Sequence, residues 1–188
     1  MYTLKWIATM TLAAAAGTCG ASGTASNPHL GRVVTQSEIA AWDISIAPDG
    51  TGLPPGSGTV KEGEAVFAAK CAVCHGPAGA GLPPGVAPAG VPAPQLVGGF
   101  GTLTGNKPVK TVGSYWPTAT TLFDYVRRAM PYTQPQSLTN DEVYALAAYI
   151  LRLNNIIGEN AVMNAKTLPK VKMPNASKFY TVYPNVRP

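Results

Sequence analysis

Two cysteines and a histidine lie together in the pentapeptide Cys71–His75 (CAVCH), which holds two of the three cysteines and one of the two histidines in the chain. Two thiols about one helical turn apart can add to two vinyl groups of a haem, and the adjacent imidazole can then ligate the iron. The spacing Cys-x-x-Cys-His is typical of c-type haem attachment. We therefore predict one haem c, covalently bound through Cys71 and Cys74, with His75 as an axial iron ligand.

Three other interpretations of the pentapeptide are open. A structural zinc site needs about four ligands, and outside the pentapeptide the chain offers only Cys19 and His29. A thioredoxin-like redox pair favours a βαβ context and a helix N-terminus, whereas this pair follows a helical pattern and precedes a Gly/Pro-rich loop. A disulfide between Cys71 and Cys74 would leave His75 unexplained.

Residues 1–25 have the pattern of a secretory signal peptide, with an early basic residue, an apolar stretch over residues 6–16, and small residues that allow cleavage after Ala21 or Ala25. The apolar stretch is too short for a membrane span, so we expect a periplasmic protein without a transmembrane anchor in its mature chain. Cleavage would also remove Cys19 and leave only the cysteines of the pentapeptide.

The remaining chain divides into a lead-in over 26–58, a domain over 59–156 and a basic, extended C-terminal tail over 157–188. A capping box from Thr35 to Glu38 predicts a short helix in the lead-in, followed by a Pro/Gly-rich run that we expect to lie across the domain.

The tail carries the excess of positive charge in the chain. It is interrupted by prolines, so we expect it to run extended over a surface, either that of its own domain or that of a partner. Its last 28 residues contain no acidic residue and five basic ones, Lys166, Lys170, Lys172, Lys178 and Arg187.

Capping and apolar periodicity predict three helices in the domain. The first begins at the capping box Thr59–Glu62 and ends in the haem motif, the second is capped at Thr121 and ends before Pro131, and the third runs over 139–154. A glycine inside the first helix, Gly63, indicates a close crossing with the third helix.

The segment 76–105 is rich in Gly, Pro, Ala and Val and nearly free of charge, which predicts a long irregular loop. Such a loop needs an apolar surface to pack on, and a haem macrocycle would supply one. The apolar side chains expected to contact it are Leu82, Val91, Leu96 and Val97.

Met130 precedes Pro131, and a residue before proline is held out of the α region, which leaves the thioether able to turn inward. Met163 and Met173 lie in the basic tail, and the other two methionines would leave with the signal peptide. We predict Met130 as the second axial iron ligand; a core-filling side chain is the alternative.

The pattern Gly63-x-x-x-Phe67 before the pentapeptide, the Met-Pro pair, and Leu146-x-x-Tyr149 in the last helix resemble the class I cytochrome c family. The resemblance implies an all-α, class I cytochrome c fold, with three to five helices around one covalent haem and extended N- and C-terminal segments. It also implies that a proline carbonyl holds the histidine. Pro94, with Leu96 beside it in the haem pocket, resembles that element, and Pro77, Pro88 and Pro92 are alternatives.

A closer resemblance is to the cytochrome subunits of bacterial sulfite and sulfur dehydrogenases. It implies no catalysis by the chain itself, which would take single electrons from a molybdopterin subunit and pass them to a downstream cytochrome or terminal oxidase. We expect no nucleic-acid partner. The stretches that carry this resemblance are Ala41–Ile44, Gly52–Gly58, Val112–Pro117, Leu122–Tyr125, Arg128–Pro131 and Leu168–Asn175.

Two alternative functions remain at this point. A free soluble cytochrome c shuttle of a respiratory chain would have the same haem site and no obligate partner. A haem sensor or peroxidase would need an open or displaceable sixth iron position, which Met130 would occupy.

Overall fold

The computed structural model describes residues 31–86, 88 and 93–179, which form parts of two units, residues 1–41 and 42–188. The signal-peptide prediction lies outside the described residues. At the start of the helix α1 (Gln36–Trp42), Thr35 and Glu38 exchange hydrogen bonds, with the Thr35 N–H donating to Glu38 Oε2 (2.9 Å); all residues of this helix except Trp42 belong to the first unit. No helix in the described part of the chain is long and apolar enough to cross a membrane.

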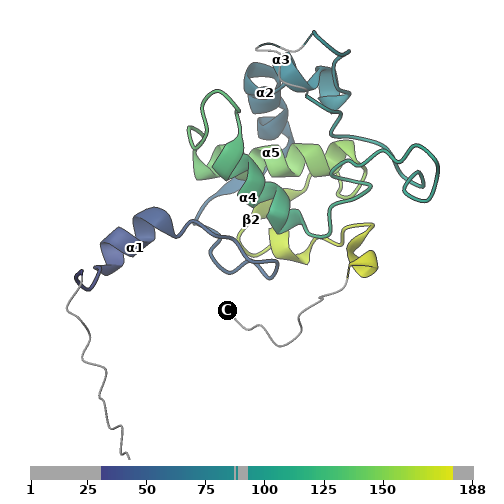
Figure 1. Cartoon of the computed structure of the whole chain (residues 1–188). Coiled ribbons are helices and arrows are strands. Elements are labelled where there is room, and N and C mark those ends of the chain that lie inside the picture. Colours follow the sequence, from purple (N-terminus) through teal and green to yellow (C-terminus); the bar gives the residue numbers. More distant parts are fainter. Residues whose placement is uncertain (1–30, 87, 89–92, 180–188) are drawn as a thin grey trace, which may run out of the picture. The chain divides into compact units, whose positions relative to one another are not determined.

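The second unit is built from three longer helices, α2 (Val60–Lys70), α4 (Ala119–Ala129) and α5 (Asn140–Leu153), with the one-turn helix α3 (Ala72–His75) after α2 (Figure 1). Capping boxes open α2 at Thr59 and α5 at Thr139, as predicted. The predicted cap of the second domain helix was wrong. Thr118 has the extended backbone of a cap and accepts the Thr121 N–H (3.3 Å), so Thr121 already lies inside the first turn.

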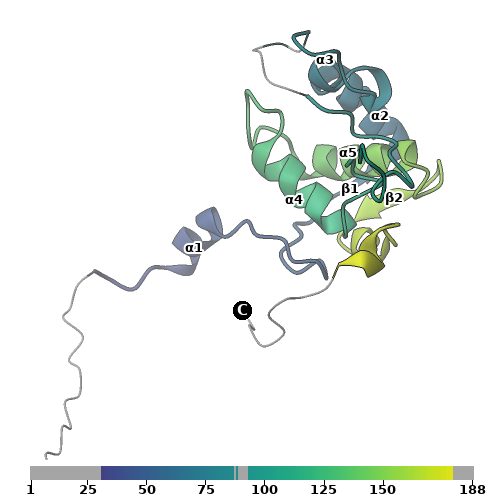
Figure 2. The same cartoon turned by 45° about the vertical axis from the view of Figure 1, so that its right-hand side comes forward.

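Helix α5 lies at the centre of the core, and every residue from Val143 to Leu151 is buried. It packs against α2 and α4 on different sides, as the two views in Figures 1 and 2 show. The Tyr144 ring lies 4.4 Å from that of Phe123 in α4, and its hydroxyl donates to the Pro54 carbonyl (2.8 Å). Its polar end is thereby satisfied inside the core.

The crossing of α2 and α5 depends on Gly63, as the sequence predicted. A Cβ atom there would overlap the backbone carbonyl of Ala145 and lie 2.7 Å from Cβ of Tyr149. One turn later the rings of Phe67 and Tyr149 lie 5.3 Å apart. The missing side chain therefore allows the two backbones to approach and the two rings to pack.

We expect Gly63→Ala to lower the free energy of unfolding by about 1–3 kcal/mol, because the added methyl group overpacks the crossing. Guanidinium unfolding of the haem-loaded protein measures the loss. Gly158→Ala is the matched control, since a Cβ at Gly158 meets nothing within 4 Å. Equal stability of the two variants would show that the helices do not need glycine at this crossing.

The lead-in from residue 42 onward lies across the second unit, as expected. Its carbonyls accept hydrogen bonds from two of the three longer helices: Pro48 from the Thr120 hydroxyl in α4 (3.2 Å) and Pro55 from the Asn140 amide in α5 (3.2 Å). It then forms the strand β1 (Ser57–Thr59), which leads into α2.

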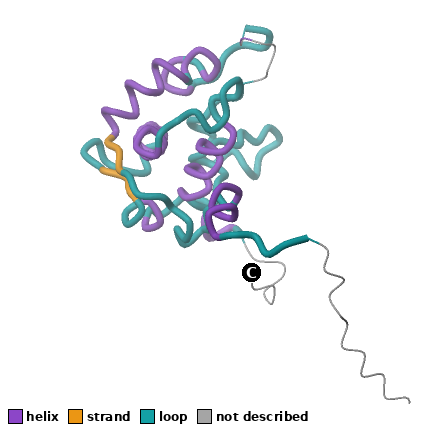
Figure 3. The backbone as a smooth tube through the Cα atoms, turned by 90° about the vertical axis from the view of Figure 1, so that its left-hand side faces the viewer, coloured by secondary structure: helices purple, strands orange, loops and turns teal. Residues whose placement is uncertain are grey.

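The described part of the tail is folded into the second unit, which differs from the predicted extended run. The strand β2 (Val162–Asn164) pairs antiparallel with β1, and the two strands are the orange segments in Figure 3. Met163 lies opposite Gly58 in this pairing. The 3-10 turns η3 (Leu168–Lys170) and η4 (Ala176–Lys178) follow. Met163, Leu168 and Met173 are buried in the core. Their five-residue spacing matches neither a helix nor a strand, so periodicity gave no sign of this burial.

Removal of residues 161–188 is therefore expected to destabilise the protein by several kcal/mol, since each buried Leu or Met side chain contributes about 1.5–3 kcal/mol. Thermal unfolding of the haem-loaded protein, followed by circular dichroism, measures the effect. Removal of 180–188 alone is the control, because it keeps all three buried side chains. An unchanged melting temperature in the longer truncation would show that these side chains contribute little to the fold.

Candidate haem site

The pentapeptide consists of Cys71, which separates α2 from α3, and the four residues of α3. Helix α2 ends at Lys70, and the Cys71 N–H donates to the Phe67 carbonyl (2.9 Å) as the helix cap. The His75 N–H donates to the Cys71 carbonyl (2.9 Å), so the one-turn helix α3 brings Cys74 and His75 back over Cys71. The two sulfur atoms and the imidazole are thus presented by one turn of backbone.

Both thiols are half-buried, and neither forms a disulfide among the described residues. Burial raises the pKa of the Cys71 thiol to about 11, with the charge of Lys70 acting in the opposite direction. A thiol with such a pKa stays protonated near neutral pH, whereas a redox-active cysteine needs a depressed pKa. No group of three or more Cys, His, Asp or Glu side chains that could hold a metal ion occurs within the described ranges, and Cys19 and His29 lie outside them.

The imidazole of His75 is oriented by the loop that follows. Its Nδ1 lies 3.2 Å from the carbonyl oxygen of Pro94, so the neutral ring can donate there and keep Nε2 for a metal ion. The Gly81 N–H donates to the His75 carbonyl (2.7 Å), and the Leu96 N–H donates to the Gly79 carbonyl (2.8 Å). These bonds fold the loop back on itself and bring Pro94 to the imidazole.

Gly79 adopts φ +71°, a left-handed conformation that favours glycine. A Cβ there would lie 3.3 Å from Cβ of Leu96 and 3.2 Å from Val97, so the returning loop packs directly over this residue. Leu96 also packs against the edge of the core. Of the other side chains expected to contact the macrocycle, Leu82 is half-buried and Val91 lies outside the described residues.

Asn154, which the site prediction missed, ties the loop to α5. It is buried at the C-terminal cap of the helix, where its amide donates to the Leu96 carbonyl (3.1 Å) and its Oδ1 accepts the Gly98 N–H (3.3 Å). A polar residue at the end of an apolar helix is the only local signal of this role. Its partners lie more than fifty residues away in the sequence.

Met130 caps the C-terminus of α4 in an extended conformation (φ −122°, ψ 145°), as its place before Pro131 predicted. Its half-buried side chain packs against the edge of the same core that Cys71 and Leu96 contact. Met163 and Met173 are both buried in the packing of the tail. Among the described methionines, Met130 is therefore the one that core packing leaves partly exposed.

The donor set fits a haem. The pentapeptide supplies two thiols that form no disulfide with any described residue and an imidazole oriented by a backbone carbonyl. The thioether of Met130 comes from the C-terminal end of α4, which packs on the same core. A family model for cytochrome c matches residues 60–154. The chain belongs to the cytochrome c family. It is accordingly a haem c protein of electron transfer, with the helical class I fold and a two-stranded sheet in addition.

A solved structure adds detail to this assignment. A chain in the crystal structure of the sulfane dehydrogenase SoxCD from Paracoccus pantotrophus is 42% identical to this chain, with a TM-score of 0.75. The match covers 84% of this chain and 74% of that one. The protein is thus a class I c-type cytochrome of the Sox type.

Proposed function

We propose that the protein is a periplasmic electron carrier of a sulfite- or sulfur-oxidising system. It receives single electrons from a molybdopterin-containing dehydrogenase subunit and passes them to a downstream cytochrome or a terminal oxidase. The observation that carries the proposal is the 42% identity to a chain of a sulfane dehydrogenase over most of both chains. The signal-peptide pattern of residues 1–25 supports the periplasmic location.

Each predicted site residue has a distinct part in this proposal. Cys71 and Cys74 would hold one haem c through thioether bonds, and His75 would bind the iron through Nε2 while the Pro94 carbonyl accepts the proton on Nδ1. The sulfur of Met130 would supply a second ligand to the iron, and Leu96 would line the haem pocket. The bound haem supplies a one-electron couple.

Two protein ligands on the iron would leave no open position for a substrate or a gas. This separates an electron carrier from a haem sensor or a peroxidase, which needs such a position. The reduced protein is therefore expected not to bind carbon monoxide, as judged by an unchanged Soret band. A shifted band at neutral pH would support the sensor or peroxidase function instead.

Affinity purification of the tagged, full-length protein from its native cells tests the partner. We expect a molybdopterin subunit to co-purify, and sulfite or a sulfur substrate to reduce the haem in that complex. If the cytochrome purifies alone and unrelated dehydrogenases reduce it as fast as the molybdopterin subunit does, it is the free respiratory shuttle instead.

A further inference from the structure

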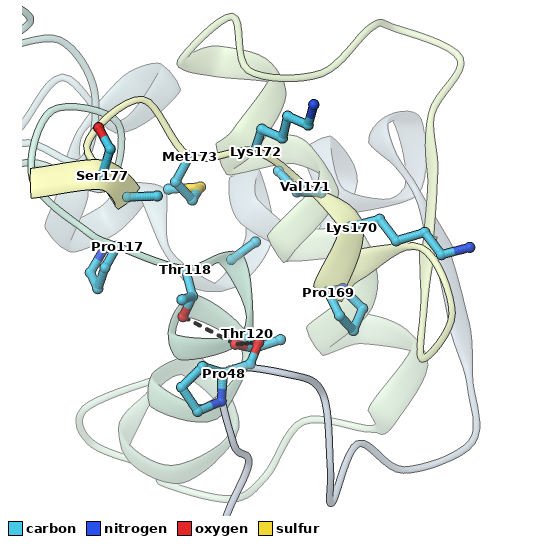
Figure 4. A pocket seen from close by; sticks show the side chains of 12 residues that line it. Pro48, Pro117, Thr118, Thr120, Pro169, Lys170, Val171, Lys172, Met173 and Ser177 are labelled. Atoms are coloured by element: carbon cyan, nitrogen blue, oxygen red, sulfur yellow. Dashed lines mark hydrogen bonds between the residues drawn. The ribbon is translucent and has the colours of Figure 1, made fainter. Parts of the chain in front are cut away.

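A groove of about 410 Å³ lies where the lead-in, the start of α4 and the tail meet (Figure 4). Within its lining, the Thr120 hydroxyl donates to the Pro48 carbonyl (3.2 Å) and lies 3.1 Å from the Thr118 hydroxyl. Most of its walls are apolar, and three are prolines: Pro48, Pro117 and Pro169. Proline walls are rigid, so a ligand would not have to order them on binding.

The rim of the groove is positively charged. Lys170 and Lys172 line it, are exposed, and project toward different sides of the chain in Figure 4. Neither lysine is in an ion pair within the described part of the chain. The acidic residue next to the groove in sequence is Asp49, whose carboxylate accepts the Thr51 N–H (2.8 Å). Two lysines against one carboxylate leave this rim with a net positive charge.

The groove lies at the opposite end of α4 from Met130. Its wall includes Ala119 and Thr120 in the first turn, and Met130 caps the last turn. Met130 follows the eleven residues of α4, of which Ala119 is the first, so the two lie roughly 16 Å apart along the helix at 1.5 Å per residue. Met130 is not among the residues that line the groove.

We propose that the groove anchors an extended segment of the molybdopterin subunit that carries acidic residues next to an apolar side chain. The inference rests on the proposed function and adds the place and chemistry of the contact. Lys170 and Lys172 attract the acidic residues of the segment and raise the rate of encounter with the partner. The apolar side chain of the segment packs between the apolar walls of the groove. The volume suits a few side chains of a peptide, since small-molecule pockets measure roughly 300–1,000 Å³.

Charge reversal tests the electrostatic part. In stopped-flow reduction of the full-length cytochrome by the isolated molybdopterin subunit plus substrate, Lys170→Glu with Lys172→Glu should slow association by about tenfold or more at low salt. The association rate of this variant should also depend less on salt, because the attraction that salt screens over about 8 Å has been removed. The limiting rate at saturating partner should not change. The matched control, Lys61→Glu with Lys107→Glu, alters the net charge equally and should have a smaller effect.

A bulky substitution tests the shape of the groove. Ser177 is an exposed lining residue, so Ser177→Trp fills the groove without a change of charge or core packing. We expect slower association with an unchanged salt slope and an unchanged haem spectrum. Carbodiimide coupling, which joins an amine directly to a carboxylate, should link Lys170 or Lys172 to an acidic segment of the partner.

Different results overturn the proposal in different ways. If the molybdopterin subunit reduces wild type and both groove variants with equal rates, the groove is not its anchor although the proposed function holds. If wild type binds no such subunit, the groove proposal fails together with the proposed function. Cross-links between two cytochromes, or loss of binding only to anionic lipid vesicles in the variants, would assign the groove to a second copy or a membrane and overturn it.

Discussion

Replacement of Cys71 and Cys74 by alanine is expected to release the haem into acid-acetone, whereas the wild-type protein should retain it after denaturation. Both thiols lie on one turn with His75 and are unbridged, so each can form a thioether with one vinyl group of the same haem. Mass spectrometry of the denatured chain and the absorbance of the extract measure the two outcomes.

The same double variant should also be far less stable. Haem would supply much of the apolar surface on which the loop 76–105 packs, and small domains have little buried surface to spare. Guanidinium unfolding of the haem-free double variant, compared with that of the haem-loaded wild type, measures this loss. Val73→Ser is the matched control, because Val73 lies between the cysteines yet is 59% exposed, and it should keep both haem and stability. Haem that leaves the wild-type chain with the solvent would disprove covalent attachment.

Helix positions could be predicted where the signal was local. The capping boxes at Thr59 and Thr139 are hydrogen-bond patterns complete within four residues, and both open helices in the structure. Thr118 was missed because several threonines in that stretch offer the same hydroxyl. The cap is decided by which residue keeps an extended backbone.

The fold of the tail could not be predicted because its partners are distant. Met163 is buried in the core where β2 pairs with β1, and that pairing joins residues more than one hundred positions apart. Proline content and charge indicated an extended run, which is correct for neither η3 nor η4. The excess of basic residues in the tail could be read from composition, and the lysines beside the groove, Lys170 and Lys172, are exposed.

The candidate site shows the same division between local and distant signals. The pentapeptide could be recognised from spacing alone, whereas Pro94 was suggested by family resemblance among several prolines. The structure places its carbonyl at His75 Nδ1 because the loop folds back through the Gly79 to Leu96 hydrogen bond. Neither spacing nor family resemblance pointed to Asn154, which holds that loop to α5. The role of Met130 as an iron ligand stays a prediction.

Met130→His is expected to lower the reduction potential by on the order of 100 mV, since axial ligands together set haem potentials over about 0.8 V. A thioether favours the reduced iron more than an imidazole does, so the substitution stabilises the oxidised state. For a one-electron couple, about 59 mV corresponds to a tenfold change in the equilibrium constant. Spectroelectrochemical titration of the haem-loaded variant measures the shift, and the ferric charge-transfer band from Met sulfur to iron should disappear.

Conservative variants of the other described methionines separate ligation from packing. Met130→Leu should abolish the charge-transfer band and open the sixth position to carbon monoxide. Met163→Leu and Met173→Leu should retain the band and the potential, because both side chains are buried in the tail packing and leucine nearly conserves their volume. A band that survives in Met130→Leu but disappears in Met163→Leu or Met173→Leu would move the axial ligand to the tail. It would also require a different arrangement of residues 157–179 around the haem.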